Sequence, residues 1–148
     1  MFGTLVRMQY TQTGDTYICK IEQGEEVVSV LTDFCVTQGI ENAHFTGIGA
    51  VKKLTCGYYA LDEKKYYFTD YAQLLEVVSL TGNIALKDGE PFVHMHGVFT
   101  GEDNNAFGGH IKEMTVGVVL EVFLKKYETS IERHLDEGIG LYLMKCGQ

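Results

Sequence analysis

From Ala43 onward, β-rich segments follow one another, and most connections between them are short. These segments are Phe45–Tyr59, Tyr66–Thr69, Leu74–Leu86, Phe92–Thr100, Ala106–Ile111, Val116–Tyr127 and Leu141–Met144. Turn-forming residues separate many of them, as in Asp62–Lys64, Lys87–Glu90 and Gly101–Asn105. Parallel strands need a crossover of about a dozen residues or more, so these strands are expected to pair largely antiparallel.

An N-terminal hairpin and a helix are expected before these strands. The stretches Phe2–Tyr10 and Thr16–Glu22 are β-rich, and the polar residues Thr11–Asp15 between them predict a turn. Apolar residues then recur at helical spacing, at Val27, Val30, Leu31, Phe34 and Cys35. Gly39 suits the left-handed end of this helix, and the acidic pair Glu25–Glu26 suits the positive end of its dipole.

These patterns predict a single domain over residues 1–148 of the α/β class, more closely of the α+β type. We expect a central, largely antiparallel sheet of about seven strands packed by one or two helices. The run Val116–Leu124 is apolar on both faces, which predicts a strand buried on both sides. Pro91 is the only proline against 17 glycines, which is typical of a strand-rich chain with tight turns.

Charge and cysteine usage narrow the function classes. The chain has 12 Lys and Arg against 20 Asp and Glu, a net charge of −8, which disfavours direct DNA binding because phosphate contacts need a basic surface. Its four cysteines stand at wide, irregular spacings, which argues against a disulfide framework or a zinc–thiolate site. No signal-peptide pattern is found, and no run approaches the roughly 20 apolar residues of a membrane span. A cytoplasmic protein without a membrane segment is therefore expected.

The clearest candidate site lies in the expected hairpin of Phe92–Thr100 and Ala106–Ile111. Strand alternation places His94 and His96 on the same face. The polar loop centred on Asp103 sets the register of the two strands. This register opposes residues of the same kind: His96 with His110, Phe99 with Phe107, and Met95 with Ile111. All three pairs agree on which face belongs to the core, and a slip of one residue would destroy that agreement.

Three imidazoles are thereby expected close together. Directly opposed Cβ atoms are about 4.5–5.5 Å apart, so His94, His96 and His110 can converge on one metal ion. Three neutral nitrogens with an open fourth position describe a catalytic type of zinc site more than a structural one. Flanking glycines leave space that a small ligand or a neighbouring subunit could fill; they are Gly97, Gly108 and Gly109. Alternatively, the histidines line a polar sheet face or subunit interface and bind nothing.

Two glutamates are further candidates. Glu76 and Glu121 lie within strongly apolar strands, where an unpaired buried carboxylate would be costly. They either orient a metal-binding histidine from the second coordination shell or face solvent or a subunit junction.

The chain resembles the PPC (plants and prokaryotes conserved) domain, also called DUF296 or predicted DNA-binding protein with a PD1-like motif. The resemblance lies in three blocks, Leu75–Ile84, Glu90–His96 and Gly108–Ile111, with Gly24–Val27 and Thr46–Val51 upstream. It implies an α/β fold around an antiparallel sheet and assembly as a homotrimer. Plant members add AT-hooks, which supply the DNA contact, whereas this chain contains no Arg-Gly-Arg-Pro core. The histidine spacing alone is similar to the zinc site of acetolactate decarboxylase.

Two hypotheses follow from the sequence. The first is a homotrimeric PPC-domain module with a three-histidine site, serving a regulatory role or associating with DNA through a partner. The alternative is a zinc-dependent enzyme, similar to acetolactate decarboxylase, that acts on a small carbonyl or carboxylate compound.

Overall fold

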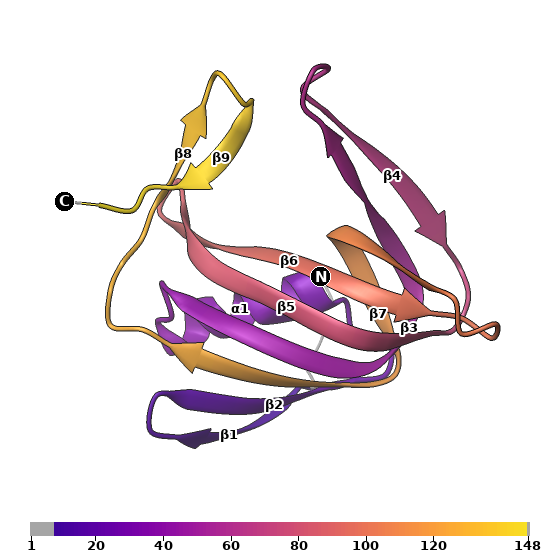
Figure 1. The fold of residues 1–148 in the computed structure, drawn as a ribbon. Helices are drawn as coiled ribbons and strands as arrows, with labels where there is room; N and C mark the ends of the chain where they lie inside the picture. Colours follow the sequence, from indigo (N-terminus) through magenta and orange to yellow (C-terminus); the bar gives the residue numbers. More distant parts are fainter. Residues whose placement is uncertain (1–7, 148) are drawn as a thin grey trace, which may run out of the picture.

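The computed structural model describes residues 8–147. Its elements, shown in Figure 1, are β1 (Gln9–Thr13), β2 (Thr16–Glu22), α1 (Val27–Gln38), β3 (Ala43–Ala60), β4 (Lys65–Tyr71), β5 (Leu75–Lys87), β6 (Glu90–Thr100), β7 (Ala106–Lys126), β8 (Arg133–Asp136) and β9 (Leu141–Met144). Seven strands form one sheet in the order β1-β2-β7-β6-β5-β3-β4, and every pairing in it is antiparallel. The expected α+β fold, with a seven-stranded antiparallel sheet and a helix packed on it, is confirmed.

The sheet closes partly on itself. Strand β3 pairs with β7 as well as with β5, so the ladders β7–β6, β6–β5, β5–β3 and β3–β7 form a ring. Helix α1 covers one face of the sheet, and the core lies between the helix and the sheet. Its fully buried large side chains include Phe45, Phe99, Met114 and Leu120. Beyond the ring, the C-terminal end of β3 and strand β4 form an arm that rises opposite the β8–β9 hairpin (Figure 1).

Helix α1 forms where its apolar spacing predicts. The carboxylate of Glu26 caps its start by accepting hydrogen bonds from the backbone N–H groups of Val28 and Ser29, at 3.1 and 2.8 Å. Gly39 ends it in the left-handed conformation, with φ at 60°. The five apolar residues of the predicted helical stripe are all buried. No helix in residues 8–147 is long and apolar enough to cross a membrane.

The N-terminal hairpin is tighter than expected. Thr11–Asp15 was predicted as the turn, but β1 continues to Thr13, which pairs with Thr16. The turn itself is only Gly14 and Asp15, because Gly14 takes a positive φ of 58° that suits a two-residue connection. Of the predicted strand Phe2–Tyr10, the part before Met8 lies outside the described residues.

The predicted strands Ala106–Ile111 and Val116–Tyr127 are in fact one long strand, β7. It pairs with β6 at its start, then passes to β3 and finally lies between β3 and β2. The prediction that its second half is buried on both sides is wrong for the single chain. Val118 and Phe123 are 57% and 54% exposed, because α1 covers only the opposite face.

The predicted last strand of the sheet, Leu141–Met144, belongs elsewhere. It pairs with β8, which the sequence pattern did not predict, in a separate two-stranded sheet. A parallel bridge between Leu86 and Glu132 and a backbone hydrogen bond from Leu86 to Ile131 attach this hairpin to the end of β5. The N-terminal hairpin supplies two of the seven strands of the main sheet, β1 and β2.

Candidate metal centre

The β6–β7 ladder has the predicted register. His96 pairs with His110 and Phe99 with Phe107, while the expected pair of Met95 and Ile111 lies one step beyond the end of the ladder. Met95, Phe99 and Ile111 are all buried in the core. The alternation that buries these side chains directs the neighbouring histidines to the other face.

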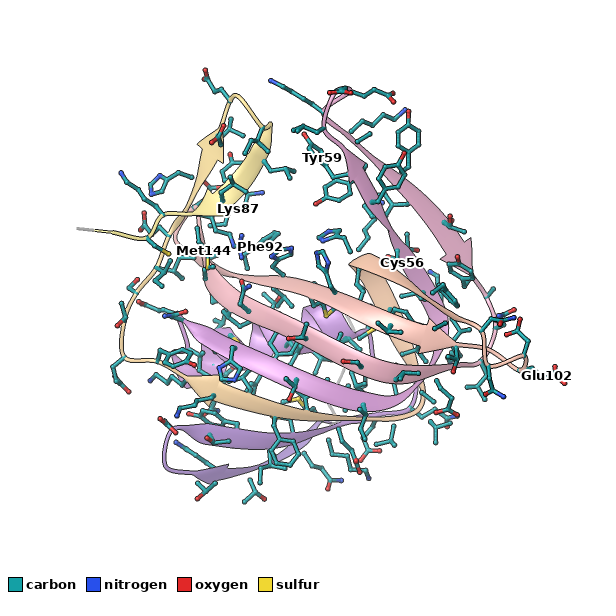
Figure 2. All side chains as sticks on the ribbon, in the orientation of Figure 1. Cys56, Tyr59, Lys87, Phe92, Glu102 and Met144 are labelled. Atoms are coloured by element: carbon teal, nitrogen blue, oxygen red, sulfur yellow. The ribbon has the colours of Figure 1, made fainter. Side chains whose placement is uncertain are left out.

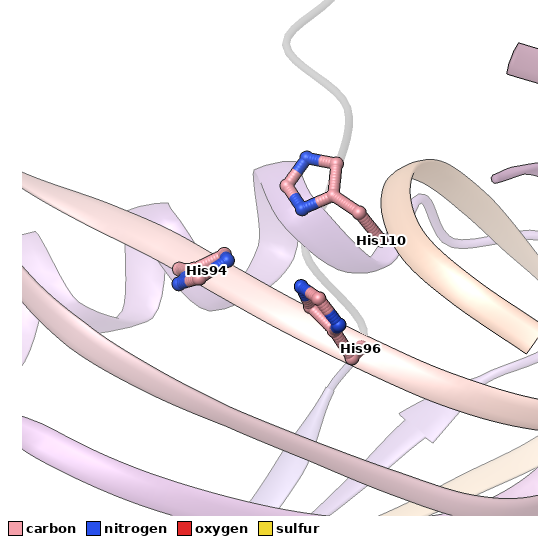
Figure 3. Close-up of side chains that lie close together, drawn as sticks. All are labelled: His94, His96 and His110. Carbon is pink, nitrogen blue, oxygen red and sulfur yellow. The ribbon is translucent and has the colours of Figure 1, made fainter. Parts of the chain in front are cut away.

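The three histidines gather on this face (Figure 3). The ring centroids of His94, His96 and His110 lie 5.1 to 5.4 Å apart, and one nitrogen of each lies within 4.8 Å of the others. Two nitrogens bound to one zinc ion at ~2.1 Å would lie no more than about 4.2 Å apart. A small rotation of the rings therefore brings the three into ligand distance.

The environment favours the neutral form of His94 and His110. Burial lowers the pKa of His94 to about 4, assisted by the positive charge of Arg133 and by the two other histidines. Burial, and then His96, also lower the pKa of His110. Within the described part of the chain, Nδ1 of His110 is buried and has no hydrogen-bond partner. Neutral imidazoles with free lone pairs are the form that binds a metal ion.

Arg133, the first residue of β8, brings a positive charge to the cluster. Its side chain is only 7% exposed. One Nη donates a hydrogen bond of 2.5 Å to the amide oxygen of Asn83 and lies 3.4 Å from Nδ1 of His94. The guanidinium also lies over the ring of Phe92, at 5.4 Å from its centroid.

Sequence reasoning missed Arg133 because its partners lie far away in the chain. Asn83 is 50 residues and His94 is 39 residues before it. The short strand β8 follows a six-residue connection after β7, and its pairing partner β9 belongs to no other sheet. The scarcity of arginine, with only Arg7 and Arg133 in the chain, was the one available signal.

Two segments meet beside the cluster. The ring of Tyr66, on β4, stacks on His110 with centroids 4.7 Å apart. The hydroxyl of Tyr59 donates a 2.6 Å hydrogen bond to the carbonyl oxygen of Ile139, and Lys64 donates one of the same length to that of Glu137. Figure 2 shows Tyr59 directed from the β3–β4 arm toward the β8–β9 hairpin. These bonds join the arm to the hairpin that carries Arg133.

The three flanking glycines lie in tightly packed surroundings. A Cβ at Gly97 would meet the ring of Phe99 in the core at 2.8 Å. A Cβ at Gly108 would collide with the backbone of Gly97, and one at Gly109 with the backbone of Gly57 on β3. Close approach of neighbouring strands therefore accounts for Gly108 and Gly109, and packing against core side chains accounts for Gly97. The space for a ligand beside them stays a prediction.

Among the described residues, the two candidate glutamates form no hydrogen bond with the three histidines of the cluster. Glu76 and Glu121 are exposed and line one shallow depression, together with Ile48, Val78 and Thr100. Their position on the open sheet face fits the solvent or subunit-junction alternative, and a role in orienting a histidine stays a prediction.

Comparison with known proteins places the chain in a family. Residues 8–128 match the model of the Plants and Prokaryotes Conserved (PCC) domain. The chain belongs to this family. It is the family that the sequence blocks resemble, so that prediction is confirmed. No curated protein matches the chain.

Several solved structures share the whole fold. A PPC protein from Pyrococcus horikoshii has 35% identity and a TM-score of 0.84, covering 99% of each chain. A metal-containing protein from Archaeoglobus fulgidus has 31% identity and a TM-score of 0.83 over 93% of this chain and 97% of its own. A candidate DNA-binding protein from Bacteroides thetaiotaomicron has 28% identity and a TM-score of 0.90 over 93% and 96%.

The likeness to acetolactate decarboxylase concerns the fold alone. The enzyme from Bacillus subtilis has 14% identity and a TM-score of 0.54, with 74% of this chain and 51% of that chain covered. This chain therefore corresponds to about half of that enzyme.

Proposed function

We propose that this PCC-domain protein is a homotrimer that binds one divalent metal ion per chain at His94, His96 and His110, and acts through it on a small carbonyl or carboxylate compound. The observation that carries the proposal is the convergence of three imidazole nitrogens within 4.8 Å on the face opposite the core. The metal-containing relative from Archaeoglobus fulgidus supports it.

The donor set favours zinc. Three imidazoles suit zinc, copper, iron and nickel, whereas magnesium and calcium take oxygen ligands. Three protein ligands leave a coordination position for a substrate, as in catalytic zinc sites. When bound there, zinc would supply a Lewis acid that polarises a carbonyl oxygen. The chain's own contribution is to keep His94 uncharged, by burial and by the nearby guanidinium, so that protons do not compete for its nitrogen.

Self-association is proposed from the open face of the sheet, and the number of three copies from the resemblance to the PPC domain. Large apolar side chains stand there exposed, with Ile48 57%, Val78 52% and Phe123 54% accessible. Apolar surface of this kind on a sheet face is typical of a protein–protein interface. A second copy of the chain is its natural partner, because most soluble oligomers are symmetric assemblies of one chain. Light scattering coupled to gel filtration measures the assembly, and a monomer or a dimer at micromolar concentration would contradict the homotrimer.

Metal analysis tests the centre. Protein purified without a histidine tag is expected to hold about one zinc per chain, and a chelator should lower its melting temperature. The variant His96→Gln should lose the metal and the effect of the chelator, whereas His134→Gln should keep both, since His134 is exposed and pairs with Glu132 instead. Wild-type protein that binds no zinc, cobalt or nickel would refute the proposal.

A DNA-associated regulatory role is the second candidate, favoured by the name of the Bacteroides thetaiotaomicron relative. The net charge of −8 opposes a polyanion, so such a role would depend on a basic partner protein. A gel-shift titration of the protein alone across salt concentrations tests direct contact. We expect no complex even at low ionic strength, and a salt-dependent complex would show that the chain itself contacts phosphates.

A further inference from the structure

Among the residues that the structure describes, Arg133 is a buried positive charge without a negatively charged partner. In residues 8–147, none of the ion pairs within 4.0 Å includes Arg133. Its hydrogen-bond partners are the neutral amide oxygen of Asn83 and the carbonyl oxygen of Tyr142, at 2.5 and 3.3 Å. Burying an ionised group without an opposite charge is costly, so a charge held in this way points to an anion that binds there.

The guanidinium is held in place rather than neutralised. Phe92 lies under it, and Asn83 and Tyr142 each take a hydrogen bond from a different Nη. A guanidinium has five N–H groups, and the contacts to Asn83, Tyr142 and His94 occupy three of them. Nε is one of the remaining donors and has no partner in the described part of the chain. The side chain is therefore held in a fixed position and still has N–H groups that can donate hydrogen bonds to a ligand.

The position of this charge relates it to the histidines. The nearest ring nitrogen of His94 lies 3.4 Å from an Nη of Arg133. Lys87 also lies over the Phe92 ring, at 5.3 Å from its centroid, so a second cation contacts the same ring. Figure 2 shows Lys87 and Phe92 together below the β8–β9 hairpin. The site therefore combines a three-histidine cluster of metal-binding type with a positive charge directly beside it.

We propose that Arg133 binds the carboxylate of a small ligand whose neighbouring hydroxyl or carbonyl oxygen reaches the metal ion. This inference rests on the metal centre proposed above. A single planar guanidinium matches a carboxylate in shape, and their charges cancel one to one. Arg133 would thus determine specificity for 2-hydroxy or 2-oxo acids over uncharged carbonyl compounds.

Cobalt-loaded protein provides the test, because the visible absorption of Co²⁺ changes when a ligand enters its coordination shell. Glycolate is the probe, and glycolamide is its uncharged counterpart of nearly the same shape. Hydrogen bonds to a charged group change binding about 10- to 100-fold, so glycolamide should bind weaker by that factor. Glycolamide that binds as tightly as glycolate would overturn the inference.

Three variants separate the contribution of Arg133 from that of the metal centre. Arg133→Met should keep the cobalt spectrum and lose about 10- to 100-fold in glycolate affinity. Asn83→Asp should lose a similar factor in glycolate affinity. It places a carboxylate where the amide oxygen lies 2.5 Å from the guanidinium, so the charge of Arg133 is neutralised within the protein. Lys125→Met removes an exposed positive charge that pairs with Asp15, and it should bind glycolate like the wild type.

The outcomes distinguish the two proposals. Wild-type protein without a cobalt spectrum would refute the metal centre. An intact spectrum with glycolate affinity unchanged in both Arg133→Met and Asn83→Asp would overturn the role of Arg133 alone. If Arg133→Met fails to fold, Asn83→Asp still decides, since it keeps the guanidinium and its support. Inorganic phosphate that binds more tightly than glycolate, with the same dependence on Arg133, would overturn the assignment of a carboxylate.

Discussion

Replacing Gly109 by alanine should destabilise the protein through the backbone. The added Cβ would lie 2.5 Å from the carbonyl oxygen of Gly57 and 3.3 Å from its carbon. Close carbon–oxygen contacts in sheets are about 3.3–3.6 Å, so β7 and β3 would have to separate by about 1 Å. Both groups in the contact are main chain and belong to the ladder that pairs Gly57 with His110, so no side-chain rotation relieves it.

We expect a loss of about 2–3 kcal/mol, the upper part of the range for overpacking a tightly packed site. For a chain of this size, each kcal/mol lowers the melting temperature by about 2–4 °C, which gives a decrease of about 4–12 °C. Urea denaturation and thermal melts of the metal-free protein measure both quantities. Gly101→Ala is the matched control, because its Cβ would meet only ordinary side-chain contacts at 3.4 Å and beyond.

The same variant separates two explanations of the glycines. The alternative is that Gly109 leaves space for a ligand rather than for a neighbouring strand. In that case the free energy of unfolding of Gly109→Ala should lie within about 0.5 kcal/mol of the wild-type value, as for substitutions away from packed features. The variant should then fail only in glycolate binding by the cobalt-loaded protein. That pair of results would refute the packing argument.

Three further predictions concern charge, capping and assembly. The metal-free protein should lose stability as the pH falls from 6.5 to about 4, because the unfolded chain protonates His94 before the folded chain does. Urea titrations at each pH should show that the stability of His94→Gln depends less on pH. The same pH dependence in this variant and the wild type would contradict the lowered pKa of His94. Glu26→Ala removes the helix cap and should lower the free energy of unfolding, measured by urea denaturation, by about 1–2 kcal/mol. Glu41→Ala, at an exposed position, should lower it by less than about 0.5 kcal/mol. Equal decreases in both variants would show that the cap is not stabilising. Phe123→Glu should reduce the molecular mass measured by light scattering without lowering the helix content, and an unchanged mass would exclude this face from the interface.

The histidine cluster could be predicted in detail because it depends on local rules. Alternation along one strand places His94 and His96 on the same face, and the polar loop around Asp103 determines which residues of the next strand lie opposite. The observed pairs of His96 with His110 and Phe99 with Phe107 follow from these two facts alone. The extent of α1 was predictable for the same reason, since both its apolar spacing and the αL residue that ends it are local.

Features that depend on distant packing were not predictable. The sequence pattern of β7 shows two β-rich segments, but their fusion into one strand depends on the change of partner from β6 to β3. The exposure of Val118 and Phe123 depends on the single helix covering the other face. Neither partner strand nor covering helix is encoded in the pattern of the strand itself.

What the sequence by itself determined is the fold class, the family and the meeting of three histidines on one sheet face. The tertiary structure alone decided that Arg133 joins them. A short hairpin can dock in many places with the same internal pairing, and its place here is selected by contacts with Leu86, Asn83 and Phe92, from strands β5 and β6. Such contacts arise only once the sheet has formed, because they join residues that are neighbours in space and distant along the chain.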